Sequence, residues 1–394
     1  MGRFADGSWQ GRGVMPVVRT DLAAMHVPGA EIWLGTRTPG TETPQRAPAI
    51  ESALAGWPMI QVQAHADEVL RAVHQEALLT HLRDIWSRWA DTGTDRVVPY
   101  LFPTIGLLGD LPEREPVAPH AAAGRYCYDT MTLVGPGTWE SARSAVDVAL
   151  TCADLLDQHG RLERHGQLDR HGRLDRHGQL DKHGQLDRHG LVYGLTRPPG
   201  HHATRSAYGG SCYLNNAAVA AQALVAAGHP RVAIVDIDAH HGNGTQDIFY
   251  RRGDVLFASV HVDPGAGWFP HYAGFADETG IGAGLGANCN VPLAPGSGDG
   301  AWLTAVSHLC DAVSGFDATA LVVSLGVDAA AEDPESPLQV TIDGYWAAGQ
   351  MLGALQLPTI ALQEGGYHLP TLGALVRTTL EGLAARRGPH TMHR

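Results

Sequence analysis

The chain has 394 residues, of which 44% are hydrophobic and 18% are charged. These proportions are typical of a folded α/β protein with a sizeable core and argue against global disorder. Its 28 basic and 41 acidic residues give a formal net charge of −13, which disfavours binding to a nucleic-acid backbone as a main task. An acidic surface suits cationic substrates, although solubility alone also explains such a charge.

Neither a disulfide framework nor a membrane segment is predicted. The five cysteines are odd in number, widely scattered and free of any Cys-x-x-Cys pair. Residues 1–13 lack the apolar run of a secretory signal, and no run of about 18 apolar residues occurs. We expect a cytoplasmic protein without a membrane or nucleic-acid partner, and formation of a homo-oligomer stays open.

A hexapeptide repeat interrupts the chain after a helix that is expected to end near Leu156. Residues 159–190 repeat the unit His-Gly-Gln/Arg-Leu-Asp/Glu-Arg/Lys five times before a final His-Gly. A six-residue period gives no continuous apolar stripe on a helix, and a glycine in every unit weakens helix and strand alike. We predict a solvated loop insertion in a single domain spanning residues 1–394, with histidines that could bind metal only loosely.

The chain after residue 190 alternates strand and helix patterns. Short apolar runs predict buried strands at residues 191–195, 232–237, 255–260, 321–325 and 358–362. Helices are predicted at residues 215–228, 302–313 and 345–355. The fold class that follows is α/β, with a central, mostly parallel sheet flanked by helices.

Four of the predicted strands end in side chains that can bind metal or transfer protons. These are, in chain order, His201 and His202, then Asp236, Asp238, His240 and Asn243, then Asp328, and finally Tyr367 after Gly365 and Gly366. Ligands collect at the carboxyl ends of the strands in open α/β sheets, so these side chains should lie close together.

Three of these residues form a candidate metal site. Asp238 and His240 form an Asp-x-His pair, which in extended chain projects both side chains to the same side. With Asp328 they supply about three ligands, the number that a hydrolytic zinc keeps while it leaves a position for water. Any one of them alone is more simply a solvated or salt-bridged strand end, but the four elements together favour a catalytic metal centre.

Several long strings in the same order resemble the histone deacetylase family. They are RPPGHHA, YGGSCYLNNAA, VDIDAHHGNGTQDIFY, VSLGVDAAAEDP and QEGGYH. The strings VVPYLFPTIGLLGD and GPGTWESA are similar to the class II and bacterial acetylpolyamine amidohydrolase branch, and Thr43-Pro-Gln-Arg resembles the family's N-terminal region. The resemblance runs from about residue 95 to the C-terminus and implies an arginase/deacetylase fold.

The resemblance also implies a role for each site residue. One catalytic Zn²⁺ would be bound by Asp238, His240 and Asp328. His202 would act as general base and acid with His201 as its electrostatic partner, and Tyr367 would donate a hydrogen bond to the oxyanion. Asp236 would orient His201, and Asn243 would orient His202.

The metal content has further implied features. Arginases, which are related, bind two manganese ions, but the positions of two further carboxylates hold Gly242 and Ala330 here, so one metal is expected. A structural K⁺ is expected near the backbone of Asp236, Asp238, His240 and Ser259. Whether zinc or iron is bound in the cell stays open.

The substrate channel departs from the family pattern. Two aromatic residues usually sandwich the substrate stem; one aligns with Phe269, but the other aligns with Ser211, which follows Gly210. The channel is then wider or more polar, or Tyr208 or Trp268 fills the space. Asp110, Glu113 and Glu115 are candidate carboxylates for an amine, although solvation alone explains each of them.

Three functions remain in view. The first is zinc-dependent release of acetate from an acetylpolyamine or another small cationic acetylated amine, or from acetyl-lysine. The second is hydrolysis of another amide by the same site. The third is a non-catalytic acetyl-group binder, which replacement of Tyr367 or of a zinc ligand would indicate; none is replaced.

Overall fold

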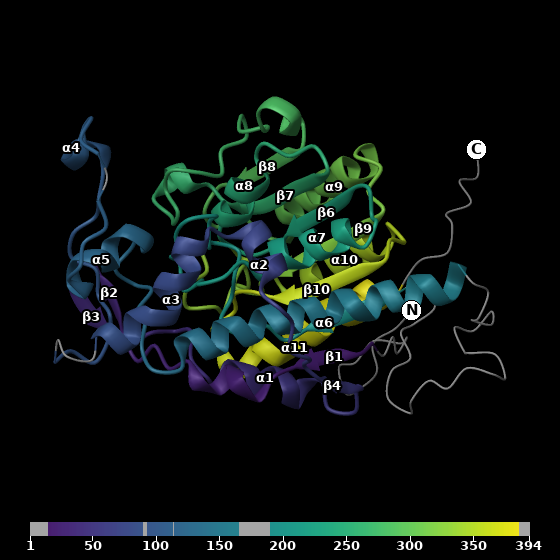
Figure 1. Cartoon of the computed structure of the whole chain (residues 1–394). Coiled ribbons are helices and arrows are strands. Elements are labelled where there is room, and N and C mark those ends of the chain that lie inside the picture. Colours follow the sequence, from purple (N-terminus) through teal and green to yellow (C-terminus); the bar gives the residue numbers. More distant parts are fainter. Residues whose placement is uncertain (1–14, 90–92, 113, 165–189, 386–394) are drawn as a thin grey trace, which may run out of the picture.

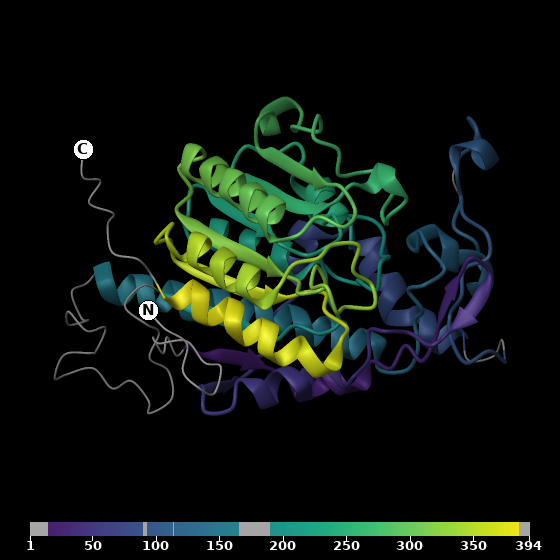
Figure 2. The same cartoon turned by 180° about the vertical axis from the view of Figure 1, so that it is seen from behind.

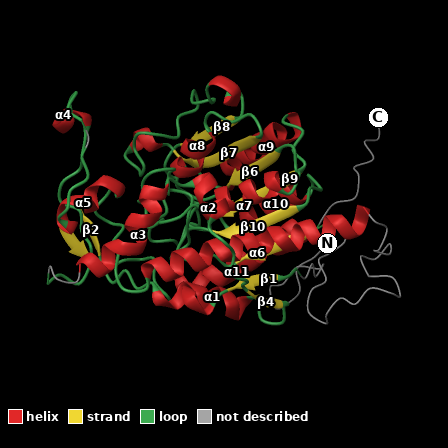
Figure 3. Cartoon of the chain, viewed as in Figure 1, coloured by secondary structure: helices red, strands yellow, loops and turns green. Residues whose placement is uncertain are grey.

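Eight parallel strands form the central sheet in the computed structural model of the protein (Figures 1 and 3). The structure describes residues 15–89, 93–112, 114–164 and 190–385. In order across the sheet, the strands are β4 (Met59–Gln61), β1 (Val17–Arg19), β5 (Leu191–Gly194), β10 (Thr359–Gln363), β9 (Ala320–Leu325), β6 (Val232–Asp236), β7 (Val255–Val262) and β8 (Asn288–Leu293). The predicted fold class and all five predicted strands are confirmed.

The central strands are apolar throughout because both of their faces are covered. In β6, Ile234 packs into a core on one face of the sheet, whereas Ala233 and Val235 pack into a second core on the other face. Side chains of a strand alternate between its two faces, so a strand buried on both sides appears in the sequence as a continuous apolar run.

Helices form a layer on each face of the sheet (Figures 1 and 2). One layer contains α2 (Glu68–Val73), α6 (Thr138–Arg164), α7 (Asn216–Ala226) and α8 (Asn243–Phe249), and the other contains α1 (Arg46–Ala53), α9 (Asp299–Gly315), α10 (Ile342–Gly353) and α11 (Leu369–Ala384). The three helices predicted after residue 190 correspond to α7, α9 and α10.

A smaller group of elements lies to one side of the sheet (Figure 1). It contains the antiparallel hairpin β2 (Glu31–Trp33) and β3 (Thr36–Thr38), together with α3 (Glu76–Trp89), α4 (Ile105–Leu108) and α5 (Pro119–Tyr126). Figure 1 shows α4 at the tip of an extended arm. No helix in the described part of the chain is both long and apolar enough to cross a membrane.

The helix before the repeat is longer than predicted. It was expected to end near Leu156, but α6 continues to Arg164 and so includes the first hexapeptide unit. Adding a residue to an existing helix costs far less than starting one, and Leu, Arg and Glu in this unit are good helix formers that offset its single glycine. Residues 165–189, which hold the rest of the predicted insertion, lie outside the described residues.

Candidate metal and catalytic site

The strand register brings the predicted site residues to one edge of the sheet. Asp236 at the end of β6 pairs with Ser259 of β7 on one side and with Ser324 of β9 on the other. Gln363 at the end of β10 pairs with Leu325 of β9. Because all these strands are parallel, the loops that follow them leave the sheet at the same edge.

Asp238, His240 and Asp328 lie with their possible ligand atoms within 4.8 Å of one another. His240 Nδ1 is 3.3 Å from Asp238 Oδ1 and 3.2 Å from Asp328 Oδ2. The remaining oxygens are held by the backbone: Gly365 N donates to Asp238 Oδ2 at 2.8 Å, and Ala239 N donates to Asp328 Oδ1 at 2.8 Å. The main chain thus fixes both carboxylates on either side of one imidazole.

The electrostatics of this group favour a cation among its three side chains. Burial and the charge of Asp238 raise the pKa of Asp328 to about 7. Burial opposes a charge on His240, but the carboxylates of Asp238 and Asp328, which accept hydrogen bonds from its ring, outweigh burial and raise the pKa of His240 well above 6.5. Two buried carboxylates need a compensating positive charge, which a divalent cation supplies while leaving the imidazole neutral. Two carboxylates and one imidazole also suit the ligand preferences of zinc.

Glycines leave the space that this arrangement needs. A Cβ on Gly365 would lie 2.3 Å from Asp328 Oδ2 and 2.6 Å from Asp238 Oδ2. A Cβ on Gly242 would lie 2.3 Å from Asp236 Oδ2, so a carboxylate side chain does not fit there without movement. This contact gives a physical reason for the predicted single metal, whereas the expected potassium site stays a prediction.

His201 and His202 are held in different environments. His201 Nδ1 donates to Asp236 Oδ2 at 2.9 Å, and His202 Nδ1 donates to Asn243 Oδ1 at 2.7 Å. Burial opposes a charge on His201, but Asp238 and Asp236 raise its pKa to about 10. The pKa of His202 is lowered well below 6.5 by burial and by the charges of its neighbours His201 and His240. The pair therefore consists of a charged ring beside a neutral ring whose lone pair is on Nε2.

Tyr367 lies in a loop that buried polar groups hold in place. Its backbone N–H donates to Asp333 Oδ2 at 2.6 Å, and the guanidinium of Arg46 lies 4.8 Å from its ring centroid. Arg46 Nε donates to the carbonyl oxygen of Gly366 at 2.6 Å. Burial raises the pKa of the Tyr367 hydroxyl well above 10, so this group stays a hydrogen-bond donor.

An ion cluster that was not predicted from the sequence lies behind Tyr367. Glu42 is fully buried between Arg46 and Arg197, with Arg46 Nη1 at 2.9 Å and Arg197 Nε at 2.8 Å from its Oε1 atom. Burial opposes the charge of Glu42, but both arginines outweigh it and lower its pKa. The only signal in the sequence was the string Thr43-Pro-Gln-Arg, which resembled the family without indicating a contact.

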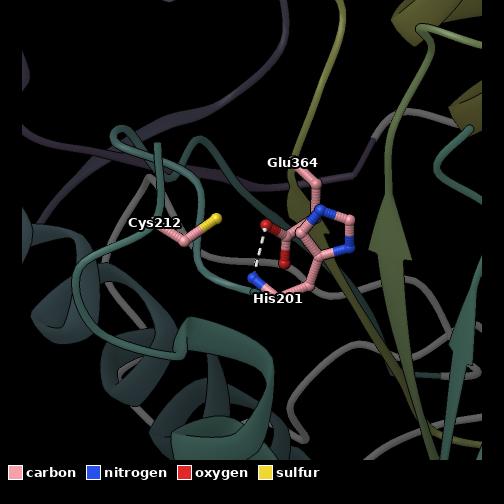
Figure 4. A group of neighbouring side chains, drawn as sticks. All are labelled: His201, Cys212 and Glu364. Carbon is pink, nitrogen blue, oxygen red and sulfur yellow. Dashed lines mark hydrogen bonds between the residues drawn. The ribbon is translucent and has the colours of Figure 1, made fainter. Parts of the chain in front are cut away.

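A second group that could hold a metal, His201, Cys212 and Glu364, has a structural role (Figure 4). Glu364 Oε2 accepts hydrogen bonds from the backbone N–H groups of Gly200 at 2.7 Å and of His201 at 3.2 Å. Burial raises the pKa of the Cys212 thiol well above 9, whereas metal binding requires a thiolate. Glu364 thus anchors the histidine loop to the end of β10.

A cavity of about 620 Å³ opens beside the His201 and His202 pair, and the predicted channel residue Phe269 lines it. Residues 32–35 of the β2–β3 hairpin, Asn243 and residues 270–273 also line it. A Cβ on the predicted channel residue Gly210 would lie 2.4 Å from the His202 ring and 2.9 Å from the Phe269 ring, so this glycine passes directly beneath both.

Other channel predictions are not supported by the structure. Tyr208 is fully buried and stacks on Tyr213, and Trp268 packs against the hydrophobic core, so neither replaces the aromatic residue lost at Ser211. Among the described residues, neither Asp110 nor Glu115 lines the cavity. Glu115 instead pairs with Arg125 at 3.1 Å, and Glu113 lies outside the described residues. These loop carboxylates were predicted from their charge alone, and the sequence offered no contact that could place them near the cavity.

The fold and the site together define an α/β protein with a buried carboxylate and histidine centre of the kind that hydrolytic metal enzymes use. The family model described as "Histone deacetylase domain" matches residues 41–383. The chain therefore belongs to the histone deacetylase family, and it is a hydrolase that acts on acetyl-amide bonds.

Individual relatives match over nearly the whole chain. Acetylpolyamine amidohydrolase 1 of Pseudomonas aeruginosa is 38% identical over 369 residues, covering 93% of this chain and 97% of that protein. The acetylpolyamine amidohydrolase of Mycoplana ramosa is 37% identical over 358 residues, covering 90% and 95%. The crystal structure of acetylpolyamine aminohydrolase from Burkholderia pseudomallei matches with a TM-score of 0.81 at 35% identity, over 95% of this chain and all of that one.

Proposed function

We propose that the protein hydrolyses the acetyl-amide bond of a small cationic acetylated amine in a zinc-dependent reaction that releases acetate. The observation that carries this proposal is the grouping of Asp238, His240 and Asp328 beside the His201 and His202 pair, with the His202 and His240 ring centroids 6.3 Å apart. A metal site next to a neutral imidazole is suited to hydrolysis by an activated water.

Asp238, His240 and Asp328 would hold the zinc ion, which when bound supplies Lewis acidity for the acetyl carbonyl and for water. His202 would accept a proton at Nε2 and pass it to the nitrogen of the departing amine. Burial and the charged His201, held by Asp236, keep the pKa of His202 low and so favour release of that proton. The Tyr367 hydroxyl would donate to the developing oxyanion.

Two carboxylates support a cationic substrate. Thr41 connects them: its backbone N–H donates to Glu31 Oε1 at 3.3 Å, and its hydroxyl donates to Glu335 Oε1. Neither carboxylate lines the cavity itself, but Glu31 immediately precedes Ile32, which does. Burial, followed by the charge of Glu335, raises the pKa of Tyr367. An ammonium group in this region would relieve the repulsion between the two carboxylates. The relatives named acetylpolyamine amidohydrolases also support a substrate of this class.

Acetate release by the zinc-loaded protein tests the proposal. With an acetylated diamine as substrate, Tyr367→Phe should lower kcat about 100-fold or more, because loss of one oxyanion donor has an effect of this size. Tyr100→Phe, at an exposed tyrosine outside the cavity, is the matched control and should leave kcat unchanged. Equal, near-zero rates for wild type and both variants would refute the catalytic proposal. Uniform preference for acetyl-lysine peptides would refute only the small-amine part.

A further inference from the structure

One side of the cavity is formed by the loop between β7 and β8, residues 263–287, which we call the cavity loop. Phe269 and residues 270–273 of this loop line the cavity. Its only helical turns are two 3₁₀ turns, Pro264–Ala266 and Gly282–Gly284. Because a loop of this kind cannot satisfy its buried backbone groups by regular hydrogen bonding, side chains from other elements must hold it in place.

The cavity loop is attached at Gly274, directly after the residues that line the cavity. The N–H of Gly274 donates to Glu278 Oε2 at 2.8 Å, and its carbonyl oxygen accepts from His261 Nε2 at 2.8 Å. The other ring nitrogen of His261 accepts from the Ser259 hydroxyl at 2.8 Å. Gly274 has a φ of 110°, and a Cβ there would lie 2.7 Å from the His241 ring. A glycine is therefore needed for the loop to pass so close to the histidines.

Gln246 of α8 connects this attachment to the sheet. Its Nε2 atom donates to Glu278 Oε2 at 2.7 Å. Its Oε1 atom accepts from His241 Nε2 at 3.1 Å, and from the Nδ2 atoms of Asn288 and Asn290 in β8 at 3.0 and 2.8 Å. Gln246 and both asparagines are buried. A carboxamide suits this place because it accepts at one end and donates to a carboxylate at the other.

The same helix carries a residue of the catalytic site. Asn243, whose Oδ1 accepts from His202 Nδ1 at 2.7 Å, is the first residue of α8 and precedes Gln246 by about one helical turn. The Phe269 ring of the cavity loop in turn meets the His202 ring edge-on, with the centroids 4.8 Å apart. One rigid helix thus holds the imidazole at its start and the cavity loop one turn later.

We propose that Glu278 and Gln246 are positioning residues that fix the cavity-lining residues 269–273 against the helix that orients His202. The proposal rests on the proposed deacetylation and assigns the pair to substrate binding. The metal ligands and Tyr367 belong to other loops, so the pair should affect KM much more than kcat or zinc affinity.

Steady-state kinetics of full-length, zinc-loaded variants with an acetylated diamine test this role. Gln246→Met removes the donor to Glu278, and Gln246→Glu places a second carboxylate against it. Each should raise KM about fivefold to tenfold and change kcat less than about threefold, because a displaced loop weakens binding without removing a group that reacts. Zinc affinity, measured by isothermal titration, should stay within about twofold of wild type.

An exchange of the two groups provides a readout that a merely structural role would not change. Gln246→Glu/Glu278→Gln again pairs one carboxylate with one carboxamide and should return KM to within about twofold of wild type. Gln246→Glu/Asp277→Asn is the matched control: it removes the neighbouring exposed carboxylate, has the same net charge and should leave KM raised.

Wild-type KM in both single variants would overturn the proposal, even if their melting temperatures were lowered. Equal rescue by Glu278→Gln and Asp277→Asn would also overturn it, because the effect would then depend on net charge and not on the contact. Failure of wild type to release acetate from any acetylated amine would instead refute the proposed function itself.

Discussion

Neighbouring side chains give two adjacent histidines opposite properties. His201 faces the carboxylate of Asp236, whereas His202 faces the neutral amide of Asn243. Their ring centroids are 4.0 Å apart, so a charge on one ring disfavours a charge on the other. The pKa of His201 rises to about 10 and that of His202 falls well below 6.5. The carboxylates of Asp238 and Asp236 thus favour a charged His201, whereas burial and the charge of His201 favour a neutral His202.

Glu31 is a residue whose charge should control the binding of cationic substrates. Burial, followed by the charge of Glu335, raises its pKa from the ordinary 4.5 to about 7. Between pH 4.5 and about 7, the folded protein therefore holds a proton on Glu31 that the unfolded chain releases. The contribution of this proton to the free energy of unfolding is complete below pH 4.5 and is lost as the pH rises through about 7. The ionised Glu31 carboxylate, which can bind an ammonium group, therefore forms as the pH rises through about 7.

A comparison of charged and neutral substrates tests this role. The ratio of KM for an acetylated diamine to KM for acetylated butylamine, which has no ammonium group, should fall about threefold to tenfold between about pH 6 and pH 8. In Glu31→Gln the ratio should be higher at pH 8 and independent of pH. Titration of the metal centre affects both substrates and cancels in the ratio. An unchanged pH dependence in Glu31→Gln would show that another group binds the ammonium.

At the scale of elements, the loops after β6, β9 and β10 make the site because the main chain holds their side chains. Gly365, directly after β10, donates its N–H to Asp238 Oδ2 and passes so close to Asp238 and Asp328 that no Cβ fits. The hydrogen bond between Gly365 and Asp238 connects residues that are 127 positions apart in the chain.

Gly365→Ala should therefore weaken metal binding more than it affects folding. Its Cβ would lie 2.3 Å from Asp328 Oδ2 and displace a ligand, which should lower zinc affinity about tenfold or more, as changes around metal ligands commonly do. Isothermal titration with zinc measures this loss, and circular dichroism checks the fold. Gly300→Ala in α9, where nothing lies within 4 Å of the new methyl group, is the control. Wild-type zinc affinity in Gly365→Ala would contradict the geometry of the site.

Elements with a strong local pattern could be predicted from the sequence, and elements without one could not. The runs of β5, β6, β7, β9 and β10 are continuous and apolar because both faces are covered. By contrast, β1 and β4 have three residues each, and β8 contains Pro292 and two asparagines at an edge of the sheet, where a proline is tolerated. Such short or polar strands are defined by their neighbours in space.

The same division applies to the site. Asp238, His240 and Asp328 follow predicted strands and were identified by residue type and spacing. By contrast, the contact of Tyr128 with Phe269 and the ion pair of Glu42 with Arg197 join segments that are distant in the chain. Their positions depend on tertiary contacts, such as the turn of residues 209–212 against the Tyr128 ring, and no spacing in the sequence indicates these contacts.

At the scale of the whole molecule, the protein combines a net negative charge with a buried, carboxylate-rich centre at one edge of a parallel sheet. The formal charge is −13, and the centre brings together Asp236, Asp238, Asp328 and Glu364, all fully or almost fully buried. Such a concentration of carboxylates is stable only with nearby positive charge, which His201 and a bound cation can provide. Metal binding, substrate charge and fold are therefore linked by the same electrostatics.

Stepwise return of zinc to the metal-free, full-length protein tests whether one zinc ion per chain drives deacetylation. Acetate release from an acetylated diamine should be lost on removal of the metal, rise in proportion to added zinc, and reach its maximum at one zinc per chain. The substitution Asp328→Asn should weaken zinc binding and lower activity together. Full activity of the metal-free protein, or a maximum reached only at two zinc ions per chain, would contradict the account.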